Sequence, residues 1–210
     1  MQTEIDRLIS ETQAERGRLV ALLGELSPEQ WDAPSLCAGW RVREVAAHIT
    51  MPFRTRPLGF MAGLAGAGFS FNRFADRDAR ATARRQSQAE LVELLRRNIA
   101  NPWQPPGGGA AGPLSHDVIH GLDVTEALGL PSAPAERIAL AIGSAGPRQL
   151  SYFGVDLTGR RLTGTDAEVS VGGEPVEVPL TAKEILLVIT GRRPLAGAPD
   201  PAARDLGRRG

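Results

Sequence analysis

The chain has little of several residue types, and each shortage excludes a class of structure. Its single cysteine, Cys37, excludes a disulfide bond within the chain. No apolar run approaches the roughly 20 residues of a membrane-spanning helix, and no charged-then-apolar leader is present. We therefore expect a cytoplasmic protein without a membrane partner. The 24 basic and 24 acidic residues cancel, whereas binding to phosphates needs a positive excess, so no nucleic acid is expected as a partner.

Lysine is almost absent as well. Lys183 is the only one, and arginine supplies the rest of the positive charge. This bias is typical of a GC-rich genome, such as that of an actinobacterium. At 210 residues, the chain is long enough to bury a sizeable core, as one large domain or two small ones.

Most of the chain has the periodicity of helices. Apolar residues at a 3.6-residue spacing predict a first helix over residues 3–26. Ser27 to Gln30 has the pattern of a capping box that starts a short helical turn. Further helices are expected over residues 41–50, from a capping box at Ser87 to about Ile99, from Pro113 to Gly129, and over residues 134–151. Residues 53–85 mix phenylalanine with glycine, which predicts a broken helix or an apolar loop, then a basic segment.

The pattern changes near residue 154. Alternating residues at 161–163, 168–171 and 176–178 predict strands, with Gly172-Gly173 as the turn of a hairpin. Thr181 to Glu184 has the pattern of a capping box before a last helix. We therefore expect a four-helix bundle over residues 1–154, a small α/β domain (strand, hairpin, helix) over residues 155–195 and a loose tail over residues 196–210.

The chain has three histidines, and two of them form His116-x-x-x-His120. Residues four apart on a helix lie on the same face, so these two imidazoles can bind one metal ion. His48, at the end of another expected helix, can complete a three-histidine site with an open coordination position, as in catalytic zinc sites. Neutral imidazole suits Zn²⁺, Ni²⁺, Fe²⁺ or Cu²⁺. The alternative is that the spacing arises by chance and that the histidines are core or surface residues.

Two carboxylates are candidates to orient these histidines. A metal-binding histidine usually donates its other N–H to an oxygen acceptor. Asp123 lies one turn beyond His120, and Glu44 lies one turn before His48.

Other side chains near these segments have less specific patterns. Arg54 and Arg56 follow the His48 helix and are candidates to bind an anionic substrate, although surface arginines are usually just solvated. Cys37 is a fourth ligand, a nucleophile or, like most lone cysteines, a small buried residue. Trp31 and Trp40 are expected in the core.

The segment from Trp31 to His48 resembles a known family. Its string W-x-x-P-S-x-C-x-G-W-x-V-R-x-V-x-x-H is similar to the mycothiol-dependent maleylpyruvate isomerase family, part of the DinB-like metalloprotein superfamily. The segment from His116 to Pro131 resembles the second motif of that family. Residues 160–192 resemble its small C-terminal domain.

This resemblance implies a mainly α fold, a DinB-like up-down-up-down four-helix bundle with a small C-terminal α/β domain. It implies a divalent metal, zinc or nickel, held by His48, His116 and His120. It also implies a low-molecular-weight thiol, mycothiol in actinobacteria, as a co-substrate. Members of the isomerase branch often carry Glu at the position of His116, and the histidine here is nearer to the wider DinB-like pattern. DinB-like bundles are often homodimers.

Three functions are consistent with these features. The first is a metal-dependent, thiol-dependent transferase or isomerase that acts on a small electrophilic substrate. The second is metal-assisted hydrolysis, for which Glu44 or Asp123 is the candidate general base. The third is a non-enzymatic stress or resistance protein that binds a metal or small ligand without turnover.

Overall fold

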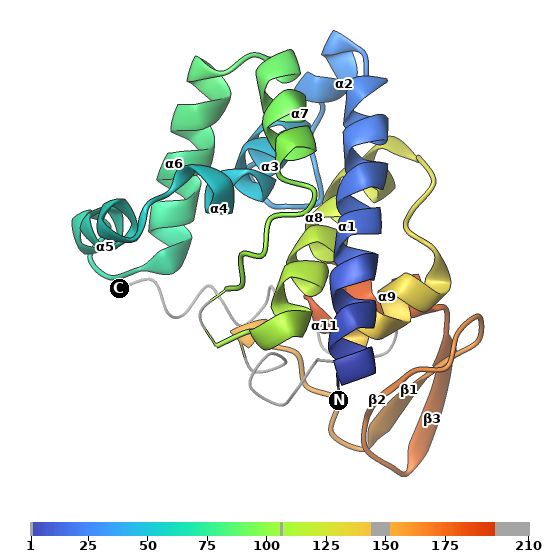
Figure 1. Cartoon of the computed structure of the whole chain (residues 1–210). Coiled ribbons are helices and arrows are strands. Elements are labelled where there is room, and N and C mark those ends of the chain that lie inside the picture. Colours follow the sequence, from blue (N-terminus) through green and yellow to red (C-terminus); the bar gives the residue numbers. More distant parts are fainter. Residues whose placement is uncertain (1, 106, 144–151, 196–210) are drawn as a thin grey trace. The chain divides into compact units, whose positions relative to one another are not determined.

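The computed structural model describes residues 2–105, 107–143 and 152–195 (Figure 1). These residues are mainly helical, with one small three-stranded sheet, as the sequence predicts. Two segments of the expected structure, residues 144–151 of the helix at 134–151 and the tail at 196–210, lie outside the described residues. Among the helices of the described residues, none is both long enough and apolar enough to cross a bilayer.

The chain divides into two compact units, residues 1–131 and residues 132–210. Helix α9 (Ala135–Ile142) falls in the second unit, where it packs on α11 (Ala182–Ile189). The structure thus divides the chain earlier than residue 154, where the sequence pattern changes from helix to strand.

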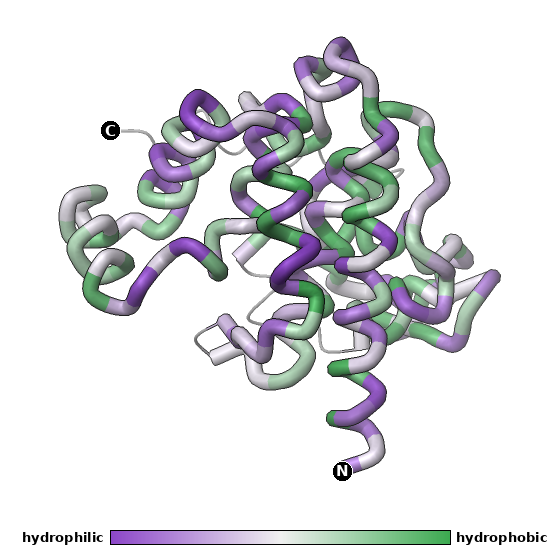
Figure 2. The backbone as a smooth tube through the Cα atoms, turned by 45° about the horizontal axis from the view of Figure 1, so that its top comes forward, coloured by the Kyte–Doolittle hydropathy of each residue, from purple (hydrophilic) through white to green (hydrophobic). Residues whose placement is uncertain are grey.

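The first unit is built from helices, most of which contribute to a shared core. Their bounds are Gln2–Gly24 (α1), Pro28–Asp32 (α2), Val42–Ile49 (α3), Met51–Arg54 (α4), Pro57–Gly66 (α5), Phe71–Arg85 (α6), Gln88–Arg97 (α7), the 3₁₀ turn Gly109–Ala111 (η1) and Gly112–Leu128 (α8). Helix α1 packs on α7 and α8, and α3 packs on α6, α7 and α8. Figure 2 shows hydrophilic and hydrophobic residues alternating along α1, whose buried face includes Leu8, Leu19 and Leu23. Trp31 and Trp40 are buried in the same core, as expected.

Local sequence signals set several helix ends. Ser27 and Gln30 cap each other at the start of α2, and Ser87 and Glu90 do so at the start of α7. These reciprocal bonds satisfy backbone N–H groups that have no partner within the helix. Helix α8 ends at Gly129, whose φ of 64° is the left-handed conformation that glycine adopts without a steric penalty. All three features are predictions of the sequence that the structure confirms.

The glycine-rich stretch after His48 forms three helices rather than a loop. Helix α4 ends before Thr55, α5 follows from Pro57, and α6 begins after a turn in which Gly68 and Phe69 have positive φ. The expected basic segment is the long helix α6, whose N-cap is Ser70. Helix α5 has no buried residue.

The second unit contains a sheet in the order β2-β1-β3. Its strands are β1 (Arg160–Gly164), β2 (Ser170–Gly172) and β3 (Val176–Leu180). Strand β1 pairs with β2 in antiparallel and with β3 in parallel orientation. The expected hairpin across Gly172-Gly173 is therefore wrong, because β2 and β3 lie on opposite edges of β1. Gly172 instead allows the backbone of β2 to lie close to that of β1, since a Cβ built there would lie 2.4 Å from the carbonyl oxygen of Arg160.

Candidate metal centre

The three histidines of the chain lie together in the first unit. His48 comes from the last turn of α3, and His116 and His120 come from successive turns of α8. One ring nitrogen of each lies within 4.8 Å of the others. The ring centroid of His48 is 5.2 Å from that of His116 and 4.6 Å from that of His120. His48 is buried, whereas the other two side chains are 15% and 13% exposed. The cluster is thus closed on the α3 side and partly open on the α8 side.

A buried carboxylate contacts each histidine of α8. Asp123 Oδ2 lies 2.9 Å from His120 Nδ1, as the one-turn spacing predicts. Asp117 Oδ1 lies 2.8 Å from His116 Nδ1. Both carboxylates are essentially inaccessible to solvent. An ionised carboxylate can only accept hydrogen bonds, so each ring would carry its proton on Nδ1 and leave Nε2 with a lone pair.

Asp117 and its partner Arg16 of α1 are not among the site residues predicted from the sequence. Neighbouring residues on a helix do not normally face each other, so the spacing of Asp117 and His116 gave no signal. Arg16 donates from Nε to Asp117 Oδ2 over 2.8 Å, and both side chains are 1% exposed. A signal for Arg16 was present. It lies on the buried face of α1, where a charged residue needs a partner.

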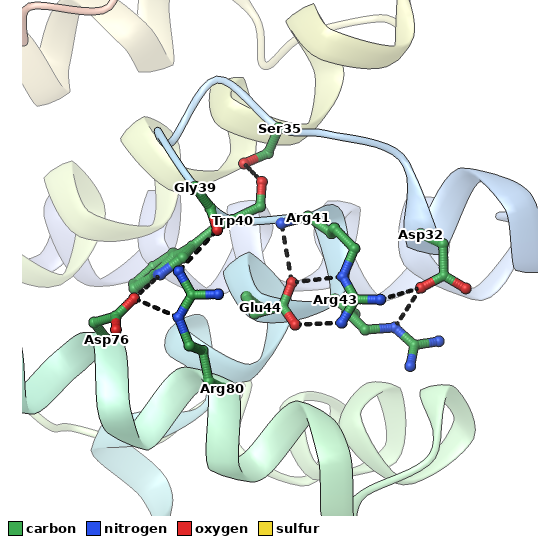
Figure 3. A network of polar contacts seen from close by, with 9 residues as sticks. All are labelled: Asp32, Ser35, Gly39, Trp40, Arg41, Arg43, Glu44, Asp76 and Arg80. Atoms are coloured by element: carbon green, nitrogen blue, oxygen red, sulfur yellow. Dashed lines mark hydrogen bonds and ion pairs between the residues drawn. The ribbon is translucent and has the colours of Figure 1, made fainter.

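Two tryptophans contact the cluster. The Trp40 ring lies 5.1 Å from that of His48, and the Trp103 ring lies 5.6 Å from that of His116 in an edge-to-face arrangement. Trp40 Nε1 donates to Asp76 Oδ1 of α6 over 2.8 Å, and Asp76 also pairs with Arg80 (Figure 3). These contacts hold the indole of Trp40 against His48.

Glu44 is bonded at the start of α3 to Arg41 and not to a histidine (Figure 3). Its carboxylate accepts hydrogen bonds from the backbone and side chain of Arg41 at 2.6–3.1 Å. Burial raises the pKa of Glu44, but the bonds from Arg41 outweigh this and hold that pKa below its ordinary value. The described contacts thus make Glu44 a cap of α3, not the expected orienter of His48. Asp32 pairs with Arg41 and Arg43 in the same network.

Arg54 and Arg56 line an open cavity of about 650 Å³. Its other lining residues are Thr55, Pro57, Leu58, Gly59, Phe74 and Asp78. Arg54 is held at the wall by Asp78, at 2.7 Å, and by the carbonyl oxygen of Ala47, the residue before His48. Arg56 is exposed, and its side chain has no hydrogen bond or ion pair with any residue that the structure describes.

Cys37 lies in the loop before α3 and is not a member of the histidine cluster. It is half-buried and packs against the core of the first unit. Such packing is typical of a lone cysteine that acts as a small apolar residue.

Comparison with known proteins assigns part of this unit. No curated protein matches the chain, and no solved structure matches it. A family model, described as the mycothiol maleylpyruvate isomerase N-terminal domain, matches residues 12–101. The matched segment runs from α1 to the end of α7 and includes His48, and α8 with the other two histidines follows it. This match over residues 12–101 confirms the resemblance to that family seen in the sequence.

Proposed function

We propose that the chain binds one divalent metal ion, Zn²⁺ or Ni²⁺, through His48, His116 and His120. The observation that supports this most is the 4.8 Å cluster of ring nitrogens formed by every histidine of the chain. The hydrogen bonds of Asp117 and Asp123 to Nδ1 fit the same role, because they direct Nε2 of His116 and His120 towards a common ligand. Three neutral nitrogen donors suit either metal.

The reaction that we propose is a thiol-dependent transfer or isomerisation of a small electrophile. When bound, the metal would lower the pKa of a thiol that coordinates it and so supply a nucleophilic thiolate. Mycothiol is the proposed thiol, because the matched family is named for it. The chain itself would supply the three imidazoles, the two carboxylates that orient those of His116 and His120, and the packing of Trp40 and Trp103 against the cluster.

The cavity beside Arg54 offers a site for the electrophile. The family name points to maleylpyruvate, an anionic compound. Arg56 is available to pair with a carboxylate on the substrate, whereas Arg54 is already held by Asp78 and would shape the cavity wall. Replacing Arg56 by Gln should raise KM for an anionic electrophile and leave kcat nearly unchanged, since the residue would contribute binding only. The same change at Arg73, which is exposed on α6, is the control.

The helix contacts support a four-helix bundle of the DinB-like kind. Helices α1, α7, α3 and α8 form a closed ring of packed neighbours, in that order. In this bundle the metal would lie between α3 and α8, with α6 packed outside on α3. The resemblance further predicts a homodimer, and light scattering of the purified chain would test its oligomeric state.

The decisive experiment is to measure bound metal in protein purified without a tag. Wild type should carry about one metal per chain. His48→Ala, His116→Ala and His120→Ala should each lose most of it, because two imidazoles alone bind a metal weakly. Wild type that holds no metal, and takes up neither Zn²⁺ nor Ni²⁺ when they are added, would contradict the proposal.

A second experiment separates the proposed reaction from the other two. The metal-loaded protein is incubated with maleylpyruvate and related electrophiles, with and without mycothiol. Turnover only with the thiol supports the transferase or isomerase. Turnover without any thiol identifies a metal-assisted hydrolase. Tight binding of the small molecule without turnover identifies a binding protein.

A further inference from the structure

Arg16 is the most completely buried cation near the histidine cluster among the described residues, with 1% of its surface exposed. Nε donates to Asp117 over 2.8 Å. Nη1 lies 2.8–3.2 Å from three backbone carbonyl oxygens that follow α7, those of Asn98, Ile99 and Asn101. The guanidinium carbon lies 5.0 Å from the ring centroid of Phe53. One side chain of α1 thus contacts α4, α8 and the chain after α7.

Two of these contacts lead to His116. The first runs through Asp117, which accepts from Arg16 with Oδ2 and contacts His116 Nδ1 with Oδ1. Because an arginine does not lose its proton in a protein, the buried pair is stable only if Asp117 carries the compensating negative charge. A charged Asp117 can only accept, which requires the proton of His116 to be on Nδ1.

The second contact runs through the backbone. The carbonyl of Asn101 is held by Arg16, and the side chain of Asn101 accepts from the backbone N–H of Trp103 over 2.9 Å. Trp103 also contacts His116, edge to face, with ring centroids 5.6 Å apart. Arg16 therefore supports two of the groups that contact the His116 ring, Asp117 and Trp103.

We propose that Arg16 is a positioning residue of the metal centre, which sets the tautomer and orientation of His116 through Asp117 and the segment from Asn98 to Trp103. This inference rests on the proposed metal site and assigns to it a residue of α1 that touches no histidine. The pair formed by Arg16 and Asp117 does more than fill the core, since its loss changes the binding of the metal as well as the stability of the fold.

The test compares Arg16→Lys with Arg18→Lys in the full chain. The Arg16 variant keeps the positive charge, but a single ammonium group cannot reach Asp117 and the three carbonyls together. Arg18 lies on the same helix and pairs with the buried Glu15 at 2.6 Å, so its variant is a matched control for loss of a guanidinium on α1. Affinity for Zn²⁺ is measured by competition with a chelator, and the geometry of the site by the absorption spectrum of bound Co²⁺.

We expect Arg16→Lys to raise the Kd for Zn²⁺ by about 10- to 100-fold, the usual effect of losing an outer partner of a metal ligand, and to alter the Co²⁺ spectrum. Arg18→Lys should change neither. If both variants lose stability to urea to a similar degree but keep the Kd and the spectrum of wild type, Arg16 has only a structural role and the inference is overturned.

A measurement on wild type covers the case in which Arg16→Lys does not fold. Long-range ¹H–¹⁵N correlation of the metal-free protein identifies the tautomer of each histidine. His116 protonated on Nδ1 supports the inference, and His116 protonated on Nε2 overturns it. Wild type that binds neither Zn²⁺ nor Co²⁺ overturns the metal site itself, whereas wild type that binds both, with no effect of Arg16→Lys, overturns the role of Arg16 alone.

Discussion

At the scale of single residues, the buried carboxylates of the first unit differ in what they bind. Asp117 and Asp123 contact histidines, whereas Glu44 forms an ion pair with Arg41. All three side chains are carboxylates, so the role of each is set by the residue that packs beside it: a histidine in two cases and an arginine in the third. Asp123 and Glu44 both lie one turn from a histidine in the sequence, but only the first has a described bond to it.

Replacing Asp123 by Ala should therefore weaken metal binding. The His120 ring would lose the acceptor at 2.9 Å that orients it, and we expect the Kd for Zn²⁺ to rise by about 10- to 100-fold. Chelator competition measures this change. Glu126→Gln, on the same helix and partly exposed, is the control and should bind Zn²⁺ as wild type does. An unchanged Kd in Asp123→Ala would show that the carboxylate does not support the site.

Glu44 should make stability depend on acid pH. Its pKa in the folded chain is lower than its ordinary value of 4.5, which the unfolded chain has. The ionised carboxylate therefore stabilises the fold above about pH 4.5, and this contribution is lost as the pH falls through the lower, folded value. Urea unfolding at several pH values should find Glu44→Gln less stable than wild type at pH 7, with the difference shrinking below pH 4.5. The exposed Glu4→Gln is the control, and a difference that does not vary with pH would refute this account.

At the scale of elements, two glycines of the helices play opposite roles. Gly129 ends α8 with φ of 64°, and Gly17 lies within α1; neither has an atom within 4 Å of a Cβ built on it. An alanine side chain therefore fits at either position, and the effect of the substitution on stability depends only on the backbone conformation. Gly129→Ala should destabilise the chain by about 1–2 kcal/mol. Gly17→Ala should stabilise it by about 1 kcal/mol. Urea unfolding measures both, and two changes of the same sign would contradict this explanation.

The elements that the sequence predicts well are those set by near neighbours. The capping boxes at Ser27 and Ser87 and the glycine end of α8 depend on residues three or four apart, and all were correct. The predicted pairing of the strands was wrong. A short turn joins β2 and β3, but both strands pair with β1 and not with each other. A glycine pair between two short strands indicates a hairpin only when the two strands are partners.

The same distinction holds for the site. The i, i+4 pair on α8 could be found in the sequence, as could Asp123 one turn on. Arg16 and Asp117 are 101 residues apart, and no local pattern joins them. Trp103 precedes α8 in an irregular segment, where its contact with His116 depends on the folded path of the chain. What the sequence could not supply were the partners that tertiary packing brings to the histidines.

At the scale of the whole molecule, all the residues of the candidate centre belong to residues 1–131. The three tryptophans of the chain, at positions 31, 40 and 103, lie in the same unit. Tryptophan fluorescence therefore reports the unfolding of the unit that would hold the metal. Zn²⁺ at 100 times its Kd should stabilise that unit by about 2.7 kcal/mol and raise its Tm by several degrees. The double variant His116→Ala/His120→Ala should show no shift, and a similar shift in both proteins would point to zinc binding elsewhere.

The distance along the sequence between His48 and His116 gives the proposed ion another effect. A metal bound by both would act as a cross-link that closes a long loop, in a chain whose one cysteine cannot form an internal disulfide. By the chain-entropy estimate used for disulfides, closing a loop of this length destabilises the unfolded state by about 4 kcal/mol. Unlike a disulfide, this link would be independent of redox conditions and would be removed by a chelator. The availability of metal would then control how long the folded chain survives, apart from any reaction at the site.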